Sequence, residues 1–146
     1  MSEEFPFLRT HLTPGLLAAA ARNLARGEKS VALFEMGAVF RDVSKLTPAG
    51  SISTAKRPKP AEIRKIYGSV PKQGLHIGGV MCGDFAQSGW WGKGRNSDWI
   101  DAVNLAGDLI AQTGNSFTIT NVELAPWHPG RCAEFIVDGK IGRAHV

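Results

Sequence analysis

His128, Arg131 and Cys132 lie within five consecutive positions of the segment WHPGRC. A thiol and an imidazole can act as nucleophile and base when they face each other and a third group orients the base. Pro129 and Gly130 separate His128 from Cys132, and both are turn-forming residues, so the two side chains do not share a helical face. The segment is therefore predicted to be a structural turn that leads into a strand, rather than a Cys–His catalytic pair.

A metal site would need several ligands at suitable spacing. The other histidines, His11, His76 and His145, are scattered, and Cys82 and Cys132 lie far apart in the chain. Neither a metal site nor a disulfide framework is indicated by this pattern. Each cysteine falls in an apolar stretch, where a buried free thiol behaves as a small hydrophobic residue. We expect two inert thiols and no cofactor or metal bound by this chain.

Glu35 is the one charged residue between Val31 and Phe40 of an otherwise apolar, strand-like segment. An unpaired carboxylate in such a place is costly, so Glu35 needs an arginine, a backbone donor or a ligand. Arg131 could pair with Glu35 or with Glu134. We predict that Arg131 neutralises Glu35 or a neighbouring carboxylate.

The glycines and acids elsewhere do not form a recognisable active site. The segment GWWGKGR has a G-x-G at Gly92 and Gly94, but it lacks the strand–turn–helix context and the Walker spacing of a phosphate-binding loop. Asp98, Asp101 and Asp108 fit the cap and the solvated face of a helix rather than an acid–base pair. No catalytic residue is predicted.

The expected elements alternate irregularly, so we predict an α+β fold with a mostly antiparallel sheet flanked by helices. Helical spacing of apolar residues marks two helices, and apolar alternation marks the strands. A length of 146 residues suits a single domain, 1–146, and no repeat or linker divides it. The helices are expected at 12–27 and 98–112, the strands at 30–43, 74–84, 116–124 and 131–139, and a hairpin turn at 138–139.

Local signals give these elements finer expectations. Thr13 is expected to cap the first helix, Pro14 to occupy its first turn and Gly27 to close it. The strand 30–43 has apolar residues on both faces, which predicts a central strand covered on both sides. In the second helix, the stripe expected to be buried consists of Trp99, Ile100, Val103, Ala106, Leu109 and Ile110.

Residues 44–73 carry four prolines and are predicted to form an extended loop, with a short helical turn at 61–67. The net charge of the chain is +4, and basic residues are concentrated in this part of it. They are Lys45, Lys56, Arg57, Lys59, Arg64, Lys65 and Lys72, against the single acid Glu62. Such a block can attract phosphates, but it can equally be a solvated loop.

No apolar run approaches the roughly 18–20 residues that span a bilayer. The first residues lack a basic region followed by an apolar stretch, so no signal peptide is indicated. We therefore expect a cytoplasmic protein without membrane contact. Trp90 and Trp91 lie in a glycine-rich connection, either at a protein interface or as a small core under the long loop.

Four local patterns in order resemble the beta subunit of phenylalanine–tRNA ligase over nearly the whole chain. They are FLRTHLTPGLLAAAARNLARG, LFEMGAVFR, the glycine-bearing strand GLHIGGVMCG, and WHPGRCAEFIVDGKIGRAHV. The residues that carry the match, and for which structural roles are expected, are Arg9, Pro14, Gly15, Asn23, Glu35, Gly37, His128, Pro129, Gly130 and Arg131. His11 stands where serine is usual in that family, and 44–73 matches nothing diagnostic.

The resemblance implies a degenerate class II aminoacyl-tRNA synthetase module, excised from a larger multidomain subunit. Such a module would be non-catalytic and would scaffold the alpha subunit of a heterotetramer that attaches phenylalanine to tRNA(Phe). The whole enzyme would use ATP and magnesium and would contact tRNA(Phe), whereas this chain alone would be inactive. The alternative is a free-standing basic RNA-binding α+β domain that uses the cations of 45–72.

Overall fold

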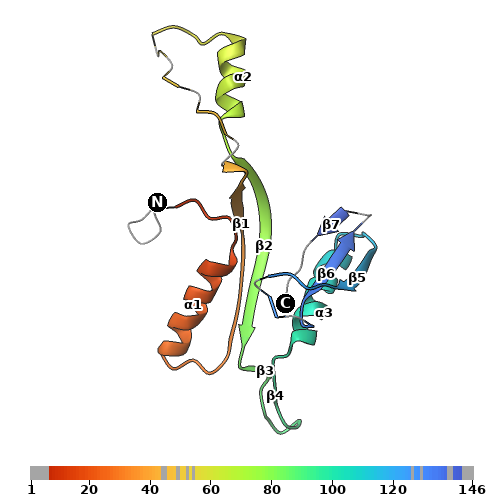
Figure 1. Ribbon diagram of the computed structural model, residues 1–146. Coiled ribbons are helices and arrows are strands. Elements are labelled where there is room, and N and C mark those ends of the chain that lie inside the picture. The colour runs from red at the N-terminus through yellow and green to blue at the C-terminus, as the bar shows by residue number, and fades with distance from the viewer. Residues whose placement is uncertain are drawn as a thin grey trace. The chain divides into compact units, whose positions relative to one another are not determined.

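The computed structural model describes residues 7–43, 46–48, 50–51, 53, 55–125, 127–128, 130–137 and 140–142. Helices and short antiparallel sheets both occur among them, as Figure 1 shows, so the predicted α+β class is confirmed. The chain forms two compact units, Met1–Val80 and Met81–Val146.

The first unit contains α1 (Thr13–Ala25), β1 (Val31–Arg41), α2 (Pro60–Gly68) and most of β2 (Lys72–Cys82). β1 and β2 are hydrogen-bonded neighbours, and their arrows run in opposite directions in Figure 1. Each of these elements lies where the sequence predicts it, including the short helix in the proline-rich loop.

The ends of α1 follow local chemistry with one exception. Pro14 occupies the first turn, and Gly27 takes a left-handed conformation with φ +97°, both as predicted. The prediction that Thr13 caps α1 is wrong. Leu12 already has helical backbone angles and is the N-cap residue, without a side-chain cap hydrogen bond, so Thr13 lies inside the first turn.

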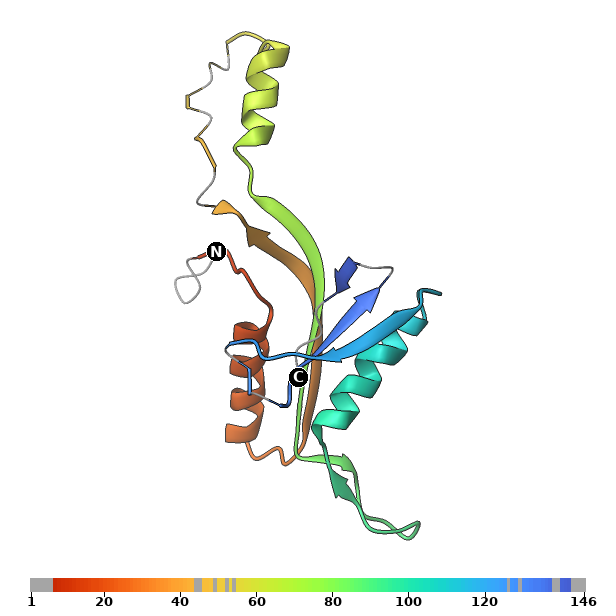
Figure 2. The ribbon, with the colours of Figure 1, turned by 45° about the vertical axis from the view of Figure 1, so that its right-hand side comes forward.

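The core of the first unit lies between α1 and one face of the strand pair, an arrangement that Figure 2 shows. Leu12, Leu16 and Val39 are buried there, with Leu33 and Val80 packed against them. The glycines of β2 allow the close approach that the sequence predicts. A Cβ atom on Gly78 would lie 3.2 Å from Leu16 Cδ1 and 3.3 Å from Leu12 Cβ.

The other face of this strand pair is exposed. Strand alternation places Phe34 and Met36 of β1, and Leu75 and Ile77 of β2, opposite the residues that contact α1. All four are more than half exposed, Phe34 at 83%. For the residues that the structure describes, the prediction that β1 is covered on both faces is therefore wrong, because α1 packs on one face and the side chains on the other are exposed.

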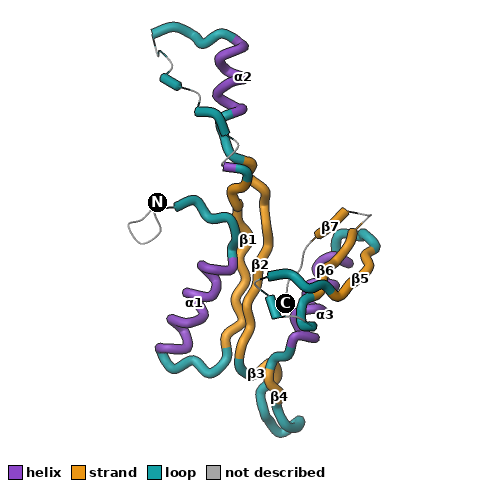
Figure 3. The backbone as a smooth tube through the Cα atoms, in the orientation of Figure 1, coloured by secondary structure: helices purple, strands orange, loops and turns teal. Residues whose placement is uncertain are grey.

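The second unit contains β3 (Asp84–Ala86), β4 (Arg95–Asn96), α3 (Trp99–Ala111), β5 (Phe117–Asn121), β6 (Ala133–Val137) and β7 (Lys140–Gly142). β3 pairs antiparallel with β4, and β5, β6 and β7 form a three-stranded antiparallel sheet in that order. Figure 3 distinguishes these strands from α3 by colour. The pairing of Val137 with Lys140 confirms the predicted hairpin, although its turn at 138–139 lies outside the described residues.

The core of the second unit centres on Phe135, whose side chain is fully buried and lies 5.3 Å from the ring of Phe117 between centroids. α3 approaches this pair through Gly107, where a Cβ would lie 3.2 Å from the Phe117 ring. The buried stripe predicted for α3 is half wrong. Val103, Ala106 and Ile110 are partly buried, but Trp99, Ile100 and Leu109 are more than 40% exposed, since the small sheet covers only a narrow strip of the helix.

Candidate functional site

A pair of aspartates caps α3, as predicted. Asp98 Oδ1 accepts a hydrogen bond from the backbone N–H of Trp99 at 2.6 Å, and Asp101 Oδ2 accepts one from the Asp98 N–H at 2.9 Å. Only 5% of Asp101 is exposed. A carboxylate buried to this degree needs a charged partner.

Arg95 is that partner and joins three elements of the second unit. Its Nη1 donates to Asp101 Oδ2 at 2.7 Å, and its Nη2 donates to Asp101 Oδ1 at 2.6 Å. The guanidinium carbon lies 4.4 Å above the ring of Phe85, within cation–π range. The pKa of Asp101 is lowered to about 2, mainly because its carboxylate accepts hydrogen bonds from Arg95. β3, β4 and the start of α3 are thus tied together by one ion pair.

The tip of the β3–β4 hairpin presents two tryptophans to solvent. Gly89 and Gly92 exchange two backbone hydrogen bonds of 3.0 Å, and between them Trp90 is 95% and Trp91 68% exposed. The two rings meet edge to face at 5.7 Å. The prediction that these tryptophans form a small core under the long loop is therefore wrong. Their exposure is compatible with the other alternative, a protein interface.

In the first unit, Arg9 holds Glu35. Arg9 Nη1 forms an ion pair with Glu35 Oε1, and its Nε donates to the carbonyl of Ala38 at 3.1 Å. The backbone carbonyl of Arg9 accepts a hydrogen bond from Phe40 at 2.9 Å. Glu35 does have an arginine partner, and that partner is Arg9, so the predicted pairing of Glu35 with Arg131 is wrong. The alternative pairing of Arg131 with Glu134 stays a prediction. Arg9 and Glu35 come from the first two motif blocks and fix the segment before α1 onto β1.

A Cβ atom at Gly37 would overlap the Arg9 guanidinium, so alanine at this position would force the arginine to move. We expect Gly37→Ala to displace Arg9 and to lower the free energy of unfolding by up to about 1 kcal/mol, because both side chains of the ion pair are at least a third exposed. Urea denaturation followed by circular dichroism measures this loss.

Gly15→Ala is the matched control. A Cβ atom there would meet nothing within 4 Å, and alanine favours a helix more than glycine does. This variant should be as stable as the parent or more stable by up to about 1 kcal/mol. Equal stability of Gly37→Ala and the parent would contradict a role for the Arg9–Glu35 clamp.

Asn23 closes α1 at its C-terminal end. Its backbone carbonyl accepts hydrogen bonds from Arg26 at 3.0 Å and Glu28 at 3.2 Å, and its side-chain amide donates to the carbonyl of Ala19 at 2.8 Å. Pro14 starts the same helix. These residues of the first motif block therefore lie at the two ends of α1.

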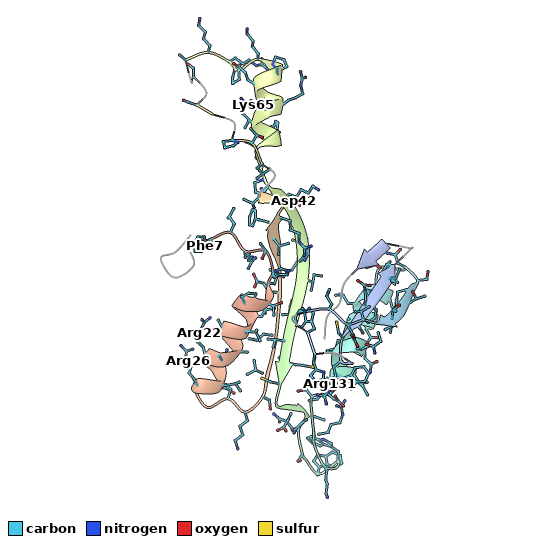
Figure 4. All side chains as sticks on the ribbon, viewed as in Figure 1. Phe7, Arg22, Arg26, Asp42, Lys65 and Arg131 are labelled. Atoms are coloured by element: carbon cyan, nitrogen blue, oxygen red, sulfur yellow. The ribbon has the colours of Figure 1, made fainter. Side chains whose placement is uncertain are left out.

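The turn predicted for WHPGR is confirmed. The backbone N–H of Arg131 donates to the carbonyl of His128 at 3.1 Å, and Gly130 has φ +81°, a conformation that favours glycine. β6 begins two residues later, at Ala133. Pro129 lies outside the described residues, and Figure 4 marks the position of Arg131.

Cys132 lies beside a small apolar pocket of about 210 Å³ between α3 and the strands β5 and β6. Trp99, Val103, Ile119 and Arg131 are among its other lining residues. Cys132 is 2% exposed, and burial, followed by the nearby Glu134, raises the pKa of its thiol. A protonated, buried thiol is a poor nucleophile, so the arrangement does not support covalent catalysis. Cys82 is also a free thiol and is partly buried.

Within the described parts of the chain, no three His, Cys, Asp or Glu side chains lie together as a metal-binding group. A separate search of the same residues finds no helix long and apolar enough to cross a membrane.

Sequence comparisons give the relationship of the chain to known proteins. The family model for the "Phenylalanyl tRNA synthetase beta chain CLM domain" matches residues 1–144. The phenylalanine–tRNA ligase beta subunit of Streptomyces avermitilis is 43% identical over 142 residues, which cover 96% of this chain and 17% of that protein. The beta subunit of Thermobifida fusca is 38% identical over 141 residues, covering 95% of this chain and 17% of the relative.

A third relative, the beta subunit of Corynebacterium glutamicum, is 37% identical over 133 residues, covering 90% of this chain and 16% of that protein. The chain thus spans less than a fifth of the length of these curated relatives. The matched family model covers all of the chain except its last two residues, and so reaches into both compact units and into every motif described above. The chain belongs to the family of the phenylalanyl-tRNA synthetase beta chain CLM domain.

Proposed function

We propose that this chain is a non-catalytic module of a phenylalanine–tRNA ligase beta subunit, with the fold of a degenerate class II synthetase domain. In this proposal it scaffolds the alpha subunit of a heterotetramer that attaches phenylalanine to tRNA(Phe). Family membership supports assignment to the beta subunit. The proposal includes a cytoplasmic location, where the enzyme would charge tRNA for translation.

The observation that carries the scaffolding role is the exposed Trp90–Trp91 pair. Tryptophan is enriched at the energetic centres of protein interfaces. The backbone hydrogen bonds between Gly89 and Gly92 hold the loop that presents both rings. Because the loop is already closed by these bonds, binding a partner through it would cost little ordering entropy.

The polar groups of the second unit are consistent with a structural role. Both carboxylate oxygens of Asp101 accept hydrogen bonds from Arg95, and one also accepts from the Asp98 N–H. This carboxylate is therefore committed to the ion pair and the helix cap and does not fit a magnesium ligand. We assign the ATP and magnesium that the ligation reaction implies to other parts of the enzyme. The chain alone is expected to show no pyrophosphate exchange.

The alpha-subunit contact is tested by Trp90→Ala in the complete beta subunit. Removing an interface tryptophan costs about 2 kcal/mol or more, which corresponds to roughly 30-fold weaker binding. The melting temperature should not change, because the side chain is 95% exposed. Isothermal titration calorimetry with the alpha subunit measures the affinity, and differential scanning calorimetry measures the stability.

Tyr67→Ala provides a matched control, since Tyr67 is also an exposed aromatic residue, at 75%, but lies on α2. It should leave the affinity for the alpha subunit within about twofold of the parent value. Equal affinity of Trp90→Ala and Tyr67→Ala would refute the Trp90–Trp91 interface.

A further inference from the structure

The segment that connects β1 to β2 carries a concentrated positive charge. Among its described residues, the exposed basic side chains are Lys56, Arg57, Lys59, Arg64 and Lys65. The acid among them, Glu62, accepts a hydrogen bond from the Lys59 backbone N–H at 2.6 Å and so caps α2. We call residues 55–71 the basic arm. Figures 1 and 3 show α2 beyond the ends of β1 and β2.

The helix of the basic arm has no core of its own. None of the nine residues of α2 is buried, and Tyr67 is 75% exposed. A helix this short is marginal in water without packing, and its support here is local, from Pro60 in the first turn and the Glu62 cap. Its surface is therefore available to a partner, and Figure 4 labels Lys65 on it.

The cation at the base of the arm is already committed. Lys72 Nζ lies 3.0 Å from Asp42 Oδ2, so this ion pair partly neutralises its charge. The charges that remain for a ligand are those of residues 56–65. In the sequence they are distributed over positions 56–65, as contacts to a repeating polyanion would be.

We propose that the basic arm binds the sugar–phosphate backbone of a folded RNA. Lys and Arg side chains in series neutralise successive phosphates and release counterions, which is the main source of sequence-independent RNA affinity. Single-strand binders stack several bases on aromatic rings, whereas this arm offers Tyr67 alone, so its charges favour backbone contact with structured RNA. In the proposed ligase this RNA is the tRNA, and only that assignment rests on the proposed function.

The test measures binding of fluorescently labelled, deacylated bulk tRNA to the full chain by anisotropy, at 50–200 mM salt. The double variant Arg64→Glu/Lys65→Glu should bind at least about tenfold more weakly and should reduce the salt slope of log K by about 1–2. Its far-ultraviolet circular dichroism and melting temperature should match the parent, because neither side chain is buried.

The matched control is Arg22→Glu/Arg26→Glu, which reverses two exposed charges on α1 and leaves the basic arm intact. Figure 4 labels both residues. The two double variants have the same net charge. If both lost the same amount of tRNA affinity, the binding would depend on overall charge, and the proposal of a local site on the basic arm would be wrong. If reversal on α2 perturbs the helix, Lys56→Gln/Arg57→Gln outside the helix should still weaken binding at least about threefold.

Three other outcomes would overturn the proposal. In the first, the affinity for tRNA does not depend on salt, and in the second, no affinity is measurable at 50 mM salt. In the third, the Arg64→Glu/Lys65→Glu variant keeps its affinity for tRNA but no longer binds the alpha subunit. The last would make the arm a contact for an acidic protein surface. Trp90→Ala should keep its affinity for tRNA. The Arg64→Glu/Lys65→Glu variant therefore tests the RNA proposal, and Trp90→Ala separately tests the alpha-subunit proposal.

Discussion

Phe135→Ala is expected to destabilise the second unit by about 3–5 kcal/mol, the usual cost of removing a fully buried phenylalanine. Phe135 has no exposed surface, and its ring packs on Phe117 while α3 approaches through Gly107. The substitution would leave a cavity at the centre of this small core. Differential scanning calorimetry measures the loss, and a melting temperature within 2 °C of the parent would contradict it.

Ile119→Ala is the matched control for this prediction. Ile119 is directly opposite Phe135 in the β5–β6 register, but half of it is exposed. Its truncation removes a similar apolar group with much less burial and should cost less than half as much as Phe135→Ala. The comparison separates loss of the core from loss of strand pairing.

The same experiment tests the organisation of the chain. We propose that residues 1–146 unfold as a single cooperative domain, although contacts divide the chain into Met1–Val80 and Met81–Val146. A cooperative domain responds to a core substitution in either unit through one common transition. Val39→Ala, in the core of the first unit, should therefore lower the same transition as Phe135→Ala. Two separate transitions, each moved by one variant, would show independent units.

Local structure could be predicted from the sequence wherever neighbouring residues determine it. Gly27 and Gly130 adopt the positive φ expected at a helix end and at a turn. Asp98 caps α3 as predicted, and the strands that the sequence predicts lie close to their expected bounds. The short strands β3 and β4, in the glycine-rich connection, were not predicted. These features depend on interactions within a few residues, so a single sequence contains the information for them.

Burial could not be predicted equally well, because it depends on what packs against each face. Phe34 and Met36 have the apolar character of a covered face, yet they are exposed on the face of the two-stranded sheet opposite α1. Trp99 and Leu109 are similarly exposed on α3. The alternation of apolar residues identified the strand, and their helical spacing identified the helix. Neither pattern says how many layers of secondary structure pack against the element.

The partners of the two carboxylates were missed for a related reason. Glu35 needed an arginine, and both Arg9 and Arg131 were motif residues, but the choice between them depends on which segment lies across β1. Asp101 and Arg95 are only six positions apart, but Arg95 ends a glycine-rich connection, whose sequence gives no fixed geometry from which to expect the pairing. An arginine shortly before a capped helix is the signal that could have suggested it.

Asp101→Asn should show how strongly this ion pair supports the second unit. In the folded chain, hydrogen bonds from Arg95 lower the pKa of Asp101 from its ordinary value of 3.8 to about 2. The stabilisation is therefore fully present above about pH 4, where the unfolded carboxyl group is also ionised, and it is lost as the pH falls towards 2. The variant lacks the charge at every pH, so it should melt at a clearly lower temperature at pH 7.

The pH dependence distinguishes the lost ion pair from a packing defect. The difference in urea midpoint between the parent and Asp101→Asn should stay constant from pH 7 to about 4.5 and should shrink between pH 4 and 3. Asp108→Asn, an exposed carboxylate on the same helix, removes one equal charge and should leave the midpoint nearly unchanged. A difference for Asp101→Asn that persists undiminished at pH 3 would mean that the carboxylate acts through shape and capping rather than through its charge on Arg95.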